Sequence, residues 1–126
     1  MTRKNINTLE LVENITKIAS ETKAIDLKAI DLKNISSLAD YLVIASARSQ
    51  KQVQGIARNI TDKLRKIGFK TYSIEGFTTG HWILIDYNDV IVHIFLDDIR
   101  AHYEFDELLS DYKQINVDQE TGDLIL

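Results

Sequence analysis

Two short apolar runs joined by a polar turn, from Gly80 to Phe95, form the clearest pattern in the chain: GHWILIDYNDVIVHIF. If Asn88-Asp89 is a two-residue loop, Tyr87 pairs with Val90 and the register of a β-hairpin follows. Side chains alternate across a strand, so each face of the hairpin has its own set. One face carries Ile83, Ile85, Tyr87, Val90, Val92 and Ile94, and is predicted to be core. The other carries Trp82, Leu84, Asp86, Ile91, His93 and Phe95. A three-residue loop would shift the pairing and mix the two sets.

Apolar periodicity predicts two helices. The first runs from about Thr8 to about Thr22, and Asn7 with Glu10 resembles a capping box at its start. The second opens at Ser49 with Gln52, in the same capping pattern, and ends at Gly68, a residue suited to the C-cap. Its predicted buried face holds Val53, Ile56, Ala57, Ile60, Leu64 and Ile67.

The remaining segments predict strands and short helices. Lys23 to Lys33 predicts a strand near a sheet edge, and the apolar run Tyr41 to Ser46 predicts a central strand. Phe69 to Glu75 predicts a strand that completes a right-handed parallel βαβ unit with the central one. Two further helices are expected, one capped by Asp97-Asp98 and reaching Tyr103, the other from Asp106 to Tyr112.

The elements together predict an α/β domain with a mixed five-stranded sheet and helices packed mainly on one face. Residues 1–113 are expected to form the single domain, and residues 114–126 a tail that is either a small hairpin or disordered. The chain of 126 residues has no cysteine, no apolar signal region after Met1 to Ile6, and no apolar run of the length, about 18 residues, that spans a membrane. A cytoplasmic protein is therefore expected.

Charge is unevenly distributed although the net charge is only −4. Residues 48–70 contain seven basic residues against Asp62, whereas residues 86–126 contain eleven acidic residues against Arg100 and Lys113. An acidic segment does not suit direct nucleic-acid binding, and it fits a basic partner protein better. The alternative is that both segments are simply solvated faces.

Residues that could support catalysis are few. The chain has three histidines, and it lacks a nucleophile elbow, a glycine-rich phosphate loop and an H-E-x-x-H motif. Asp26 and Asp31 point to opposite faces of their strand, so they do not converge on a metal. We therefore expect no catalytic residues, no metal and no cofactor. The hairpin face around Trp82 is either a docking surface for a partner or core beneath the final helices, and the pattern leaves both open.

Several segments, taken in order, resemble the bacterial ribosomal silencing factor family, RsfS, also called Iojap-related. They include Asp40-Tyr41 leading into VIAS, the Ser-x-x-Gln-Val helix start, Glu75-Gly76, the strand from Trp82 to Asp86, the run from Asp89 to His93, and Tyr103. The resemblance spans about Leu11 to Tyr112. The sequence departs from the family pattern at Ala47, at Ile99 and at Phe105-Asp106 with Leu108-Leu109.

The resemblance implies a translation repressor that is not an enzyme. Such a protein binds the large ribosomal subunit through ribosomal protein number fourteen, blocks joining of the small subunit when nutrients are scarce, and forms a homodimer when free. It also implies a fold like that of nucleotidyltransferases without their catalytic carboxylates. The expected contact residues are Glu75, Trp82, Leu84, Asp86, Tyr87, His93 and Phe95. No membrane and no sequence-specific nucleic acid are expected as partners, and the rival functions are a nucleotide-binding protein and a homodimeric scaffold.

Overall fold

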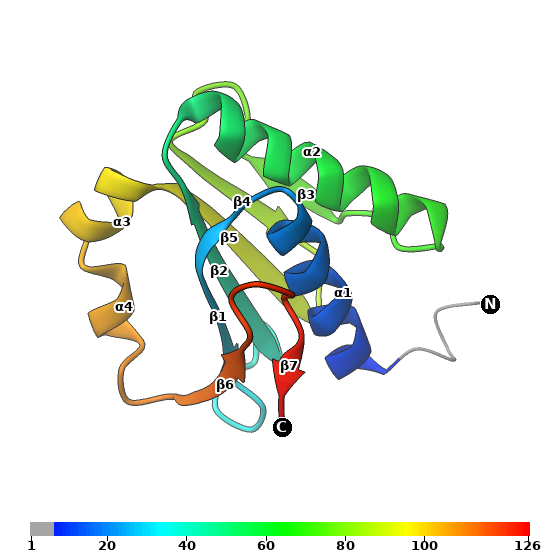
Figure 1. The fold of residues 1–126 in the computed structure, drawn as a ribbon. Coiled ribbons are helices and arrows are strands. Elements are labelled where there is room, and N and C mark those ends of the chain that lie inside the picture. Colours follow the sequence, from blue (N-terminus) through cyan, green and yellow to red (C-terminus); the bar gives the residue numbers. More distant parts are fainter. Residues whose placement is uncertain (1–6) are drawn as a thin grey trace.

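The computed structural model describes residues 7–126 and shows a twisted sheet with helices on both faces (Figure 1). The helices are α1 (Thr8–Glu21), α2 (Gln50–Lys66), α3 (Asp97–His102) and α4 (Phe105–Leu108). The strands are β1 (Ile25–Asp31), β2 (Tyr41–Ala47), β3 (Ser73–Glu75), β4 (Trp82–Asp86), β5 (Val90–Leu96), β6 (Lys113–Val117) and β7 (Leu124–Ile125).

The sheet has the strand order β3-β4-β5-β2-β1-β6-β7, and every neighbouring pair is antiparallel except β2 with β5. A mixed sheet is confirmed, but the predicted number of five strands is wrong, because the C-terminal tail adds β6 and β7. The tail therefore forms a hairpin, the first of the two expected alternatives, and β6 pairs with β1. For the same reason β1 does not lie next to an edge. β2 lies at the centre, as predicted, and all its residues are buried.

The predicted hairpin register is confirmed. Trp82 pairs with Phe95, Leu84 with His93 and Asp86 with Ile91. The amide of Tyr87 donates a hydrogen bond of 2.9 Å to the carbonyl oxygen of Val90, so Asn88-Asp89 is the two-residue loop. Asn88 has a φ of 73°, a left-handed conformation that asparagine adopts more readily than most residues. The two faces of the hairpin are therefore those the alternation predicts.

Each face of the sheet packs against its own pair of helices. α1 and α2 cover one face and bury the larger core, which includes all six residues of the predicted core face of the hairpin. The short helices α3 and α4 lie against the opposite face over a smaller apolar cluster, in which Ile30, Leu42, Ile44 and Phe95 are buried. Within residues 7–126, none of the helices is both long enough and apolar enough to cross a membrane.

The segment after α2 differs from its prediction. The C-cap residue of α2 is Ile67, and the predicted capping glycine, Gly68, follows it with a left-handed φ of 98°. The amide of Phe69 donates to the carbonyl oxygen of Leu64 at 2.9 Å. Phe69 is thus part of the end of the helix, and the predicted strand from Phe69 is shortened to Ser73–Glu75. Ile67, which was predicted to be buried, is exposed. β3 runs parallel to β2, but it is not its neighbour, because β4 and β5 lie between them.

The short C-terminal helices also depart in detail. α3 has Leu96 at its N-cap and no side-chain cap, so Asp97 and Asp98 lie in its first turn instead of capping it. α4 is a single turn and starts at Phe105, one residue before the prediction, after Glu104 breaks the helix with a φ of 50°. The break turns α4 back over the sheet face.

Candidate functional site

The candidate site is the face of the β4–β5 hairpin on the side of α3 and α4. Glu75, Leu84 and His93 are direct neighbours across β3, β4 and β5, so their side chains point to the same face. Glu75 is exposed, Leu84 is half-buried and His93 is buried. The face therefore grades from an accessible edge at β3 to a covered region at β5.

Trp82 stands where the open part of this face meets the covered part. Its ring centroid lies 4.7 Å from that of Phe95, 5.4 Å from that of Tyr103 and 5.7 Å from that of Phe105. Trp82 is only partly buried, and Tyr103 beside it is 55% exposed. Neither alternative for Trp82, core or contact, describes the whole side chain. One part packs against residues of the α3–α4 segment, and the rest is accessible.

The orientation of the indole is fixed by a hydrogen bond to a buried histidine. Nε1 of Trp82 donates to Nδ1 of His93 at 2.9 Å. Burial lowers the pKa of His93 to about 4, so the ring is neutral at pH 7. Because Nδ1 accepts the hydrogen bond from the indole N–H, the proton of the neutral imidazole lies on Nε2. This histidine positions the tryptophan within an apolar cluster.

A buried arginine holds α3 and α4 in place over the face. Arg100 is 7% exposed, and its guanidinium donates two hydrogen bonds to the carboxylate of Asp106, at 2.8 and 2.9 Å. Nη1 also donates to the hydroxyl of Ser46 and to the carbonyl oxygen of Asp26, both at 2.8 Å. Nζ of Lys28 reaches the same carboxylate at 2.6 Å. Hydrogen bonds from Arg100 and Lys28 lower the pKa of Asp106 to about 2, so the carboxylate stays ionised.

Sequence reasoning did not find this cluster. The spacing of six residues between Arg100 and Asp106 does not predict that they pair, because a break between α3 and α4 separates them. Lys28 and Ser46 come from strands far away in the chain. The sequence predicts Tyr103 as the end of a helix and as part of the family resemblance, but its contact with Trp82 depends on the fold.

The seven predicted contact residues fall into three groups. Glu75, Trp82, Leu84 and Asp86 share one face and are at least partly accessible. His93 and Phe95 lie on the same face but beneath it, at 8% and 0% exposure, so they support the surface from within. Tyr87 is on the other face, in the core beneath α1 and α2, at 2% exposure. Tyr87 is therefore not on the accessible face in this structure, as the alternation of side chains along the strand predicts.

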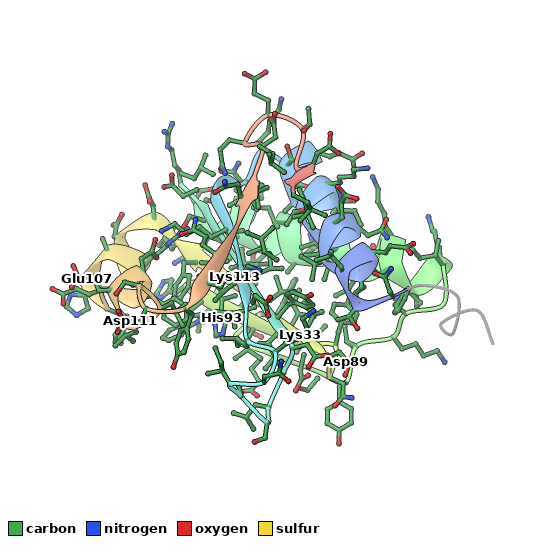
Figure 2. The ribbon with its side chains drawn as sticks, turned by 90° about the horizontal axis from the view of Figure 1, so that it is seen from below. Lys33, Asp89, His93, Glu107, Asp111 and Lys113 are labelled. Carbon is green, nitrogen blue, oxygen red and sulfur yellow. The ribbon has the colours of Figure 1, made fainter. Side chains whose placement is uncertain are left out.

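Two carboxylate side chains, Glu75 and Asp86, lie on the accessible part of the face. Asp86 is half-buried, and its Oδ1 accepts a hydrogen bond of 2.7 Å from the amide of Asn88. In the view of Figure 2, Lys113 and Lys33 are drawn nearest to His93, and Glu107 and Asp111 on one side and Asp89 on the other lie farther out. Across residues 7–126, no three His, Asp or Glu side chains are grouped closely enough to hold a metal ion. The described site is an aromatic and aliphatic patch whose acidic border consists of Glu75 and Asp86.

Comparison with known proteins relates the chain to one family. Residues 5–124 match the family described as "Ribosomal silencing factor during starvation". The ribosomal silencing factor RsfS of Bacillus subtilis is 38% identical over 110 residues, which cover 84% of this chain and 93% of that protein. The chloroplastic protein Iojap of Zea mays is 32% identical over 116 residues, covering 90% of this chain and 49% of that longer protein.

Solved structures share the fold. A crystal structure of a protein from Bacillus halodurans superposes with a TM-score of 0.78 at 31% identity, covering 87% of this chain and all of the other. A crystal structure of a protein from Chromobacterium violaceum gives a TM-score of 0.81 at 27% identity, covering 86% of this chain and 90% of the other. The architecture described above is thus seen in experimental structures of similar proteins.

Proposed function

Because the chain belongs to the ribosomal silencing factor family, we propose that it represses translation by binding the large ribosomal subunit and sterically blocking the small one. The proposed contact is ribosomal protein number fourteen of the large subunit. The proposed docking face comprises Glu75, Trp82, Leu84 and Asp86. The repressor acts in the cytoplasm, without catalysis and without a cofactor.

The observation that carries the proposal is the partly exposed Trp82 on a rigid β-hairpin, next to Leu84 and bordered by carboxylates. Aromatic anchors on ordered strands lose little conformational entropy on binding and dominate the energy of many protein interfaces. The hydrogen bond to His93 and the packing on Phe95 and Phe105 hold the indole in one orientation before any partner arrives.

The acidic border suits a basic ribosomal protein. Asp86 and the exposed Glu75 flank the apolar centre, where they can pair with lysine or arginine. Charges at the rim of an interface accelerate encounter more than they slow dissociation, and salt screens them. We therefore expect the association rate to fall as salt rises, with a smaller change in the dissociation rate.

Subunit joining, followed by light scattering, tests the proposal. Pre-incubation of large subunits with the wild-type protein is expected to slow the scattering rise that follows addition of small subunits. Trp82→Ala is expected to weaken inhibition by about 30-fold in concentration, equivalent to about 2 kcal/mol for a hot-spot residue. A folded Trp82→Ala variant that inhibits as well as the wild type would remove Trp82 from the docking face.

Self-association through the same face is the second candidate, since a partly exposed apolar patch can serve a dimer as well as a partner. Sedimentation velocity of the free protein, followed by addition of large subunits, separates the two uses. A dimer that dissociates as it binds the subunit uses one face for both. A dimer that binds intact uses another surface for self-association.

A further inference from the structure

The solvent side of α2 carries a line of basic side chains. Lys51, Arg58 and Arg65 recur every seven residues, so they lie along one stripe of the helix, and all three are exposed. The buried residues of α2 lie on its opposite side, against the sheet. Lys66, at the end of α2, extends the line of cations to about 22 Å from Lys51, at 1.5 Å per residue.

Most of these cations have no acidic partner. Lys63 pairs with Glu21 at 2.8 Å, and Arg65 pairs with Asp62 at 3.2 Å. In the described part of the chain, no ion pair involves the other five basic residues of this region: Arg48, Lys51, Arg58, Lys66 and Lys70. We call these five residues and Arg65 the α2 stripe; Arg48 and Lys70 flank the two ends of the helix. An acidic protein thus leaves a concentrated, unneutralised positive charge on one helix and its flanks.

The centre of the stripe is ordered by packing. The guanidinium of Arg58 lies 5.2 Å above the ring of Phe77. Nε2 of Gln54 donates to the carbonyl oxygens of Phe77 and Thr78, at 2.8 and 3.1 Å, so the loop after β3 is tied to α2. A cation held in this way loses less freedom when it binds an anion than one on a free side chain does.

The stripe and the docking face are on opposite sides of the sheet, because α2 covers one face and Trp82 lies on the other. A protein bound at Trp82 therefore leaves the α2 stripe accessible. The stripe also differs in charge from the acidic border of the docking face, so a single basic partner does not suit both.

We propose that the α2 stripe binds the phosphate backbone of ribosomal RNA beside the protein docking site. The inference rests on the proposed function, since it takes the chain to be bound to a ribosomal subunit, where RNA is the abundant polyanion. Cations spaced along an exposed helix suit contacts with phosphates, which do not depend on base sequence. The expected absence of sequence-specific nucleic-acid recognition is compatible with such contacts.

Fluorescence anisotropy with a labelled RNA hairpin of mixed sequence tests the inference. The triple variant Lys51→Gln/Arg58→Gln/Lys66→Gln is expected to bind at least about 10-fold more weakly at 100 mM salt. Its slope of log affinity against log salt should be smaller by about 2 to 3, the contribution of three phosphate contacts. Glutamine forms helix about as well as lysine, so α2 should stay folded, which circular dichroism checks.

Two further variants keep the test sharp. Lys23→Gln/Lys33→Gln/Lys113→Gln changes the net charge equally at exposed sites outside the stripe, and it should retain RNA affinity within about 3-fold. Lys51→Gln/Lys66→Gln/Lys70→Gln leaves Arg58 on Phe77, and it should lose affinity as the first triple variant does. Equal losses in the stripe and control variants would overturn the inference. So would binding that is confined to phosphatidylserine vesicles and absent with RNA.

The inference and the proposed function can fail separately. The stripe variant is expected to bind the isolated ribosomal protein as the wild type does, but to bind whole large subunits more weakly. Leu84→Ala on the docking face is expected to bind the RNA hairpin normally. Unchanged binding of the stripe variant to whole subunits contradicts the RNA contact and leaves the docking face standing.

Discussion

The hydrogen-bonded pair of Arg100 and Asp106 holds α3 and α4 against the sheet, so weakening it should lower the free energy of unfolding. Asp106→Asn weakens the pair with little change in side-chain shape. The asparagine keeps one oxygen for Arg100, but it removes the negative charge that both Arg100 and Lys28 contact. A buried guanidinium then loses its counter-ion. The variant should therefore loosen the α4 turn that places Phe105 on Trp82.

The magnitude follows from the pKa of the carboxyl group. A fall from the ordinary value of 3.8 to about 2 corresponds to about 2.5 kcal/mol of stabilisation of the folded state. The Asp106 side chain is 34% exposed, so solvent screening reduces this to about 1 to 2 kcal/mol. For a domain of this size, that lowers the midpoint of thermal unfolding by roughly 4 to 8 °C.

The pH dependence has a definite sign. The folded-state pKa is lowered, so the stabilisation is fully present above the unfolded-state pKa, near 3.8, and is lost as the pH falls through about 2. The difference in unfolding free energy between wild type and Asp106→Asn should be constant from pH 5 to pH 7. It should shrink between pH 4 and pH 2.

Urea unfolding followed by circular dichroism at pH 7, 5 and 3 measures this difference. Asp111→Asn is the matched control, because Asp111 is exposed and no ion pair of the described residues involves it. The control should change the free energy by less than about 0.5 kcal/mol. An equal loss in both variants, or a loss at Asp106 that does not depend on pH, would refute the reasoning.

Three further predictions concern stability. The pKa of His93 is lowered to about 4, so wild-type stability should fall by up to about 3 kcal/mol between pH 6.5 and pH 4, as only the unfolded state gains a proton. His93→Gln, which keeps an acceptor for Trp82, should flatten that part of the urea-unfolding profile, and an unchanged profile would contradict the assignment. Gly76→Ala should destabilise by about 3 kcal/mol or prevent folding, because Gly76 has a φ of 80° and an added Cβ would overlap the carbonyl oxygen of Trp82; near-wild-type thermal stability would contradict this. Gly55→Ala should stabilise α2 by about 0.5 to 1 kcal/mol, since an added Cβ there meets open space, and a lower unfolding midpoint would count against it.

The local pattern of the sequence was sufficient to predict the β4–β5 hairpin and α2. The Asn88-Asp89 turn and strict alternation fixed which side chains share a face, and period and caps defined α2 from Ser49 to Gly68. These features depend on neighbours within a few residues, so a single sequence carries them.

Features that depend on distant residues were missed. The alternation of Ile115 and Val117, both buried, was a usable signal for β6, but its partner β1 lies more than 80 residues earlier in the chain. The crossover from β2 to β3 passes two strands that come later in sequence, so adjacency could not be inferred from chain order. The coverage of Trp82 depends on Arg100 and Asp106, whose pairing arises only when α4 folds back. Tertiary contacts decide such features.

Co-sedimentation with separated ribosomal subunits tests the docking face most directly. The wild-type protein should sediment with large subunits and not with small ones. Leu84→Ala and Asp86→Asn, which leave the aromatic cluster and the turn acceptor intact, should each weaken binding by about 5- to 10-fold. Ile125→Ala, an exposed apolar residue at the far edge of the sheet, is the control and should bind normally. Absence of the wild-type protein from the large-subunit fraction, or full binding by the combined Leu84→Ala/Asp86→Asn variant, would contradict the account.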